Sequence, residues 1–152
     1  MSVSAPPPTA TAAEFQRAFI GLVRAFGLHQ PERTPCGQPV PISEAHALLE
    51  LDGEALLTQN ELAQRLRLQK STVSRLVSQL EHKHWLQRER DARDRRAVRL
   101  RLTDAGREIA RATIAARTEK FERLVAAIPS DERAVVVETL RLLAHLSEHD
   151  KE

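Results

Sequence analysis

The sequence has few of the residues on which many folds and activities depend. Its 152 residues include one cysteine, one tryptophan and no tyrosine, and aromatic residues make up only 3% of the chain. A single cysteine excludes a disulfide within the chain and favours a reducing compartment. No apolar run approaches the ~18 residues that a membrane-spanning helix needs. The first residues lack the basic and apolar regions of a secretory signal, so we expect a cytoplasmic protein with no membrane partner.

Patterns that carry catalysis or metal binding are also missing. The chain has no glycine-rich phosphate loop, no serine–histidine–aspartate order, and no pair of carboxylates for which burial can be argued. His82 and His84 are two residues apart, on different sides of a predicted helix. His145 and His149 have the i, i+4 spacing of zinc ligands, but only Glu148 lies near them. We therefore expect no metal, no cofactor and no enzymatic activity.

Proline is absent from the middle of the chain. The sequence holds eight prolines, yet none lies between Ile42 and Ile128, so this block is predicted to be continuously structured. Residues 1–11, with three consecutive prolines at positions 6–8, are predicted to form a disordered N-terminal arm. Residues 29–41 hold four more prolines and are predicted to form a loop.

Apolar residues recur at helical spacing in six segments. The predicted helices cover about residues 12–28, 43–52, 59–66, 70–83, 104–127 and 131–146. Their predicted caps are Thr11, Ser43, Thr58, Thr103 and Ser130. Residues 98–102 alternate strictly between apolar residues and arginine, which indicates a half-buried strand, and residues 85–90 are its predicted partner. The fold class is therefore mainly α with a small β-hairpin.

Positive charge is concentrated in one third of the chain. Residues 60–107 hold 13 basic and 6 acidic residues and carry +7, whereas the whole chain carries +2 and the remainder therefore −5. Such segregation is typical of a protein that binds a polyanion. A solvated basic face without a partner is the alternative. The acidic remainder should point away from a bound nucleic acid.

Residues 59–83 are predicted to form a helix–turn–helix. Apolar residues at 73, 76, 77 and 80 make one buried stripe on the second helix, which leaves the opposite face for the major groove of DNA. The predicted contacts on that face are Lys70, Ser71, Thr72, Ser74, Arg75 and Ser78. Arg75 can pair with guanine through two hydrogen bonds, and Lys70 adds charge at the helix N-terminus. Plain solvent exposure is the alternative for each serine.

The arginine-rich segment between the two strands is predicted to be the tip of a wing. Arg96 is expected to enter the minor groove, with Asp94 orienting its guanidinium group. Arg93 and Arg95 are expected to contact phosphates. The arginines of residues 98–102 are expected to face outward and to supply general electrostatic attraction only.

The wing segment resembles the signature of the MarR family of winged helix–turn–helix transcriptional regulators. The matching residues are Asp94, Arg95, Arg96, Leu100, Leu102, Thr103 and Gly106. The likeness covers residues 42–107 strongly and the flanking helices by order and length. The family usually has glycine where this chain has His84, so His84 must adopt a left-handed cap or the helix must end differently.

The resemblance implies a homodimer that binds a palindromic operator in double-stranded DNA, commonly as a repressor released by a small-molecule effector. Residues 12–41 and 103–152 correspond to a helical dimerisation lobe, and residues 42–102 to the winged helix–turn–helix lobe. The apolar positions of the predicted helices at 12–28, 104–127 and 131–146 are too many for one small lobe to cover, and they favour a dimer independently. A two-fold axis would place two recognition helices roughly 34 Å apart.

The effector and the lone cysteine define the remaining alternatives. An effector cleft is expected between the two lobes, with His46 as its candidate residue. Cys36 could make the protein a thiol-based redox-sensing regulator, although only Arg33 lies near it in the sequence. A sensor whose readout is a protein partner instead of DNA is the alternative from another functional class.

Overall fold

The computed structural model describes residues 10–53, 56–91 and 97–149. The elements are α1 (Ala12–Phe26), α2 (Ile42–Leu51), β1 (Leu57–Thr58), α3 (Gln59–Leu66), α4 (Lys70–His82), β2 (Leu86–Arg90), β3 (Val98–Leu102), α5 (Asp104–Ala127) and α6 (Arg133–His149). The predicted fold class, mainly α with a small hairpin, is confirmed. The predicted wing-tip contacts Arg93, Asp94, Arg95 and Arg96 lie outside the described residues.

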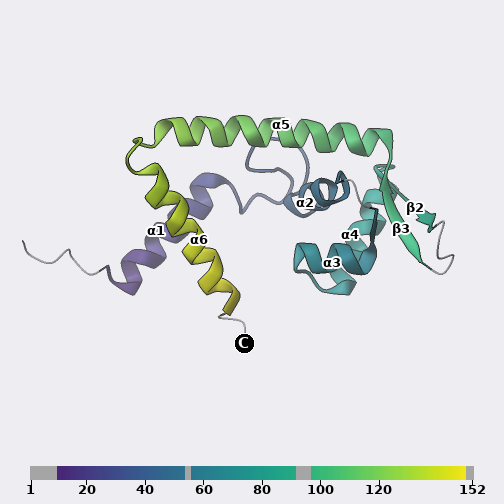
Figure 1. Cartoon of the computed structure of the whole chain (residues 1–152), viewed down its shortest axis with the longest axis horizontal. Coiled ribbons are helices and arrows are strands. Elements are labelled where there is room, and N and C mark those ends of the chain that lie inside the picture. Colours follow the sequence, from purple (N-terminus) through teal and green to yellow (C-terminus); the bar gives the residue numbers. More distant parts are fainter. Residues whose placement is uncertain (1–9, 54–55, 92–96, 150–152) are drawn as a thin grey trace, which may run out of the picture.

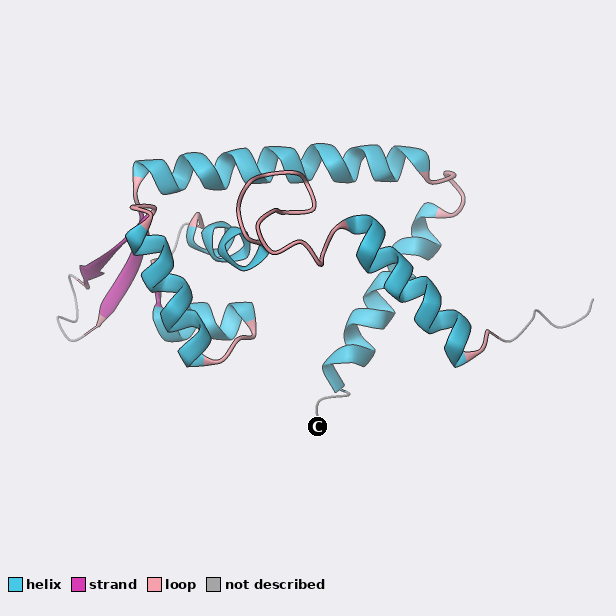
Figure 2. Ribbon diagram, turned by 180° about the vertical axis from the view of Figure 1, so that it is seen from behind, coloured by secondary structure: helices cyan, strands magenta, loops and turns pink. Residues whose placement is uncertain are grey.

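Helix α5 forms the long axis of the molecule (Figure 1). Helices α2, α3 and α4 and the strands lie at the end where α5 begins, and α1 and α6 extend away from the other end. Figure 2 shows from behind that the connection between α1 and α2 loops beneath the middle of α5. The 24 residues of α5 therefore connect two separate groups of elements.

The three strands form one antiparallel sheet in the order β1-β3-β2. Leu57 of β1 pairs with Leu100 of β3, and Leu86 of β2 pairs with Leu102. All four leucines are buried, so one face of the sheet packs on the core. β1 was not predicted, because two residues give no readable alternation.

The hydrophobic core lies entirely within the winged end of the molecule. Its members are Val40, Ala45, Ala47, Leu48, Leu51, Leu57, Leu62, Ala63, Val73, Leu76, Val77, Leu80, Leu86, Leu100, Leu102 and Ala110. In α1, all of which is described, no side chain is buried. The apolar side chains that the sequence predicts to be inward on α1 and α6 are therefore exposed or only half-buried in a single chain.

Local hydrogen bonds set most helix starts as predicted. Thr11 with Glu14 and Thr58 with Glu61 form capping boxes, and the Thr103 hydroxyl accepts from the Gly106 amide at 3.1 Å.

Two of the predicted helix starts, those of α2 and α6, are wrong. Helix α2 begins at Ile42 with Pro41 at the N-cap, so Ser43 lies inside the first turn and does not cap it. Helix α6 begins at Arg133 and not after Ser130, because the Glu132 amide donates to the Pro129 carbonyl oxygen at 3.0 Å and closes a turn first.

The hairpin is joined tightly to the start of α5. His84 adopts the left-handed conformation (φ 58°), which was one of the two alternatives left open, and the Trp85 amide donates to the Leu80 carbonyl oxygen at 3.0 Å to end α4. The Thr103 hydroxyl then donates to the His84 carbonyl oxygen at 2.7 Å. Gly106 lies so close to the Trp85 backbone that a Cβ atom would approach the carbonyl oxygen to 1.9 Å. Glycine is therefore required at this crossing.

Candidate nucleic-acid interface

Helix α4 turns its apolar side to the core and its polar side to solvent. Its buried residues are Val73, Leu76, Val77 and Leu80, as the spacing predicts. The predicted DNA contacts that are exposed are Lys70, Ser71, Thr72, Arg75 and Ser78, whereas Ser74 is half-buried. The Ser78 hydroxyl donates to the Ser74 carbonyl oxygen at 3.0 Å, which leaves its oxygen available as an acceptor.

The N-terminus of α4 is open to solvent. Arg67 ends α3 in the left-handed conformation (φ 54°), and the Leu68 amide donates to the Ala63 carbonyl oxygen at 3.1 Å, which turns the chain between the two helices. Gln69 makes no side-chain cap hydrogen bond, and the first turn contains no acidic residue. With Lys70 at its first position, this helix end offers amide N–H groups and a cation, which together suit a phosphate.

Ion pairs account for much of the positive charge between residues 60 and 107. The pairs are Arg65–Glu50, Arg67–Glu148, Lys83–Glu44, Arg88–Glu81, Arg99–Glu61, Arg99–Asp91, Arg101–Glu89 and Arg107–Asp104. Among the described residues of this stretch, the basic side chains outside these pairs are Lys70, Arg75 and Arg90. The sequence did not single out Arg90, which ends β2 opposite Val98, because it resembles its charged neighbours.

Arg99 and Arg101 correct the prediction for the arginines of β3. Both were expected to supply general electrostatic attraction, yet both guanidinium groups bind carboxylates. Arg99 Nε donates to Asp91 Oδ2 at 2.7 Å and Arg101 Nε to Glu89 Oε2 at 2.6 Å. Their charges are therefore largely compensated within the protein and contribute less to the external field than their number suggests.

Arg88 joins the hairpin to both helices of the helix–turn–helix. It lies opposite the buried Leu100 in the sheet register. Its Nε donates to the two carboxylate oxygens of Glu81 on α4 at 3.0 and 3.1 Å, and one terminal nitrogen donates to Gln59 Oε1 on α3 at 3.3 Å. The side chain thus fixes β2 against α3 and α4.

Glu61 connects the start of α3 with the sheet. Its carboxylate accepts from the Thr58 amide at 2.6 Å and from Arg99 at 2.9 Å. Hydrogen bonds from the backbone and then the side chain of Thr58 lower the pKa of this carboxyl, and the positive charges of Arg99 and Arg65 add smaller effects in the same direction. The group is therefore held ionised as cap and ion-pair partner together.

Comparison with known proteins identifies this arrangement. Residues 38–97 match the MarR family. An uncharacterised HTH-type transcriptional regulator of Mycobacterium leprae is 26% identical over 135 residues, which are 89% of this chain and 91% of the relative. The crystal structure of Streptococcus pneumoniae FabT in complex with DNA is similar with a TM-score of 0.66 and 25% identity, over 90% of this chain and 92% of FabT. Over residues 38–97 the chain therefore has a sequence and fold of the MarR type.

A solved structure from another organism supports the same assignment. The PcaV transcriptional regulator from Streptomyces coelicolor has a TM-score of 0.67 and 26% identity to this chain, over 92% of this chain and 99% of PcaV. The chain is therefore a DNA-binding transcriptional regulator of MarR type and not an enzyme. Within the described residues, no group of three or more potential ligands could hold a metal ion. Helices long and apolar enough to cross a membrane are likewise absent from that part of the chain.

A pocket of about 230 Å³ lies between α2, α5 and the loop that connects α1 to α2. Its lining is Phe26, Leu28, Thr34, Pro35, Cys36, Ile42, Ala45, His46, Leu49, Thr113, Arg117, Lys120 and Phe121. The Lys120 ammonium donates to the Pro35 carbonyl oxygen at 2.6 Å and lies 4.4 Å from the centre of the Phe26 ring. The regulator thus places two cations and His46 around a largely apolar space.

Cys36 is half-buried in the wall of this pocket. Its Sγ lies 3.0 Å from the hydroxyl oxygen of the buried Thr34. The chain contains no second cysteine with which it could form an internal disulfide. Redox sensing through Cys36 therefore stays a prediction.

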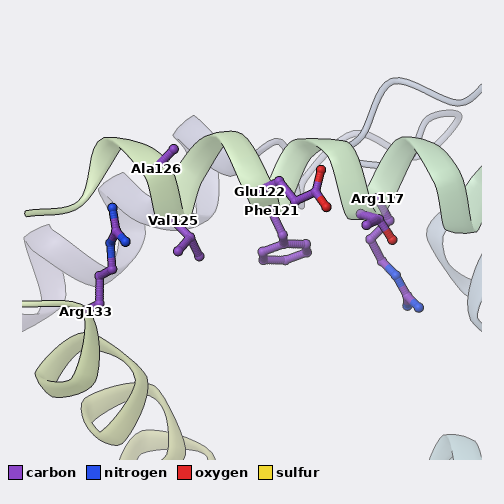
Figure 3. A pocket seen from close by; sticks show the side chains of 7 residues that line it. Arg117, Phe121, Glu122, Val125, Ala126 and Arg133 are labelled. Atoms are coloured by element: carbon purple, nitrogen blue, oxygen red, sulfur yellow. The ribbon is translucent and has the colours of Figure 1, made fainter. Parts of the chain in front are cut away.

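A second hollow, of about 570 Å³, lies at the corner between α5 and α6. Figure 3 shows Phe121 and Val125 pointing from the same side of α5 into this space, with Arg117 and Arg133 at its two ends. Phe121 and Val125 are 47% and 45% exposed, so an apolar surface of the regulator is left uncovered at this corner.

Proposed function

We propose that this regulator of MarR type is a homodimer that represses transcription from a palindromic operator until a small ligand releases it. The observation that carries the dimer is the apolar surface exposed on α1, α5 and α6. Its larger side chains are Phe15, Phe19, Ile20, Leu22, Phe121, Leu124, Val125, Val135, Val137, Leu140, Leu142 and Leu146. Monomeric soluble proteins rarely expose apolar patches of this extent, and a second copy of the same surface is a fitting partner.

The hollow between α5 and α6 supports the same proposal (Figure 3). An apolar floor with charged residues at both ends suits an amphipathic helix from the second copy. In a two-fold dimer each protomer would cover the corner of the other, and both lobes would be related by the same axis.

On DNA, we assign the major groove to α4 and the minor groove to the wing tip. The α4 contacts are Lys70, Ser71, Thr72, Ser74, Arg75 and Ser78. Arg96 would enter the minor groove, with Asp94 orienting it, and Arg93 and Arg95 would contact phosphates. The exposed polar face and open N-terminus of α4 support this assignment, and two-fold symmetry would match it to a palindrome.

The effector is proposed to bind the pocket beside α2. Arg117, Lys120 and His46 around an aromatic floor suit a small anionic ring compound, and PcaV has been crystallised with its natural ligand. A thermal-shift screen of benzoate and hydroxybenzoates tests this. A ligand that raises the melting temperature of the wild type but not of Arg117→Gln would support it, and equal shifts for both proteins would contradict it.

Sedimentation and gel-shift experiments test the dimer and its DNA binding. We expect the wild type to sediment as a dimer and to shift the DNA upstream of its own gene at low salt. Leu140→Glu should sediment as a monomer, because it places a charge in the proposed interface. Gln64→Glu adds the same charge on α3 and should leave the dimer intact. A monomeric wild type that still shifts DNA would disprove the dimer.

The wing and the thiol alternative need one further variant each. Arg96→Ala should weaken the gel shift strongly without lowering the melting temperature. Wild-type binding by Arg96→Ala would make the wing assignment wrong. A peroxide-sensitive shift that is lost in Cys36→Ser would favour the thiol-based alternative.

A further inference from the structure

The Arg99 side chain joins three separate parts of the winged lobe. Its Nε donates to Asp91 Oδ2 at 2.7 Å, and one terminal nitrogen donates to Glu61 Oε2 at 2.9 Å and to the Leu56 carbonyl oxygen at 3.2 Å. Only 27% of the Arg99 side chain is exposed, and 17% of Asp91. The ion pair between them is therefore partly shielded from water, which strengthens it relative to an exposed pair.

Each partner of Arg99 belongs to a different element. Asp91 follows β2, and its amide donates to the Ala97 carbonyl oxygen at 3.0 Å, which closes the described part of the hairpin. Leu56 immediately precedes β1. Glu61 lies in the first turn of α3 and caps that helix through Thr58. One guanidinium group thus connects the far end of the hairpin with the start of the helix–turn–helix.

The backbone alone holds this junction weakly. Among the described residues, β1 pairs with β3 through two residue pairs, Leu57 with Leu100 and Thr58 with Arg99. Arg99 therefore stands at the last backbone pair between the hairpin and the segment that leads into α3. Its rigid planar fork reaches acceptors in several directions at once, which a lysine ammonium on a flexible stem cannot reproduce.

Arg101 is a natural comparison on the same strand. It lies two residues from Arg99, carries the same charge and is 42% exposed. Its ion pair with Glu89 stays within the hairpin. Among the described residues, its guanidinium group makes no hydrogen bond to α3 or to the segment before β1. Loss of either arginine changes the net charge of the wing equally, but of the two only loss of Arg99 removes a link between β3 and α3. The link from Arg88 on β2 to Gln59 on α3 remains in both variants.

We infer that Arg99 is a positioning residue for DNA binding, which fixes the hairpin on α3 and so sets the placement of the wing relative to α4. It acts through Asp91, Glu61 and the Leu56 carbonyl and does not contact DNA. The inference rests on the proposed function, because it requires α4 and the wing to bind DNA together. A hairpin that takes the binding orientation in about one molecule in ten would raise the apparent Kd about tenfold for each half-site.

The test measures binding of a fluorescent duplex that the wild-type protein has selected from a randomised pool. We expect Arg99→Gln to bind more weakly than Arg101→Gln by about tenfold for each half-site of the duplex. The slope of log affinity against log salt should be the same for both variants, because neither side chain contacts a phosphate. Equal affinities, or a shallower salt slope for Arg99→Gln than for Arg101→Gln, would overturn the inference.

Asp91, the acidic partner of Arg99, allows a test in which the net charge changes in the opposite direction. Asp91→Asn makes the protein more positive, so electrostatic attraction alone predicts tighter DNA binding. We expect weaker binding instead, because the Arg99 guanidinium group loses the carboxylate that holds it beside Glu61 and the Leu56 carbonyl. Glu89→Gln makes the same charge change at the partner of Arg101 and should not weaken binding. Tighter binding by Asp91→Asn than by the wild type would overturn the inference.

Two further variants, Arg99→Lys and Arg75→Gln, test the shape of the Arg99 side chain and the proposed α4 contact. Arg99→Lys keeps the charge without the fork, so we expect it to remain several-fold weaker than the wild type, and full recovery of binding would count against the inference. If Arg99→Gln does not fold by circular dichroism, Arg99→Lys and Asp91→Asn decide the question. Arg75→Gln tests the proposed α4 contact separately: unchanged binding would refute that contact and leave the comparison of Arg99 with Arg101 intact.

Discussion

Gly106→Ala should destabilise the regulator, although alanine is the better helix former. In the open first turn of a helix this substitution would stabilise by about 1 kcal/mol. Here the added Cβ would lie 1.9 Å from the Trp85 carbonyl oxygen, and ordinary contact begins at 3.4 Å. Backbone must therefore move by about 1.5 Å, the difference between these two distances. A displacement of this size would break the bond that the Thr103 amide donates to the Trp85 carbonyl oxygen at 3.1 Å.

Three effects set the size of the fall in the free energy of unfolding caused by Gly106→Ala. One or two lost hydrogen bonds, including that from the Thr103 hydroxyl to His84, cost about 1–2 kcal/mol. Overpacking against backbone costs about 2–3 kcal/mol more. After subtraction of the helix-propensity gain, the free energy of unfolding should fall by about 2–4 kcal/mol.

Urea denaturation followed by the fluorescence of the single tryptophan measures this change. Ala105→Gly, at an exposed position in the same turn, is the control and should cost no more than about 1 kcal/mol. A Gly106→Ala protein as stable as the wild type would refute the assignment of this close crossing.

Two further predictions concern charged groups in the winged lobe. Lys83→Met should lower the free energy of unfolding by about 2–4 kcal/mol, because it leaves Glu44 buried without the ammonium that lies 2.6 and 2.8 Å from its two oxygens. The double variant with Glu44→Gln should recover most of this loss, and a double variant as unstable as Lys83→Met would contradict the explanation. Glu61 has a pKa lowered below its usual value of 4.5, so its contribution to stability is present above that pH and is lost as the pH falls through the folded-state pKa. Glu61→Gln should lose less stability on acidification than the wild type in urea titrations. Identical dependence of stability on pH in the two proteins would contradict this role of Glu61.

The features that the sequence predicted correctly depend on residues close together in the chain. The capping boxes of Thr11 and Thr58 join residues three apart, and the buried stripe of α4 repeats within one helix. The left-handed His84 was one of two ways in which α4 could end before β2 begins, so the sequence narrowed the conformation of this helix end without deciding it. The capping boxes and the stripe could be predicted because each is stabilised by its own neighbours.

The features that the sequence missed join residues far apart in the chain. Arg99 and Glu61 are 38 residues apart, and Lys83 and Glu44 are 39 apart. Nothing in the local sequence tells whether an arginine on a strand faces solvent or a distant carboxylate. The sequence therefore identified a stretch rich in basic residues, but it could not separate the arginines that form ion pairs within the lobe from the basic residues outside those pairs.

The division of the basic residues into those inside and those outside ion pairs predicts how strongly DNA binding depends on salt. If all 13 basic residues between 60 and 107 contacted phosphates, the slope of log affinity against log salt would be about −12 for each protomer. Three of them, Lys70, Arg75 and Arg90, lie outside the ion pairs of the described residues. With the three proposed contacts of residues 93–96, the expected slope is no steeper than about −5.

Anisotropy titrations at several salt concentrations measure this slope. Arg90→Gln should make it shallower by about 0.9, whereas Arg101→Gln should leave it unchanged, because the charge of Arg101 is already compensated by Glu89. A measured slope near −12 would mean that the paired arginines exchange their carboxylates for phosphates when DNA binds. In that case Arg99 could not hold the hairpin on α3 in the complex, so this measurement also tests whether Arg99 positions the wing.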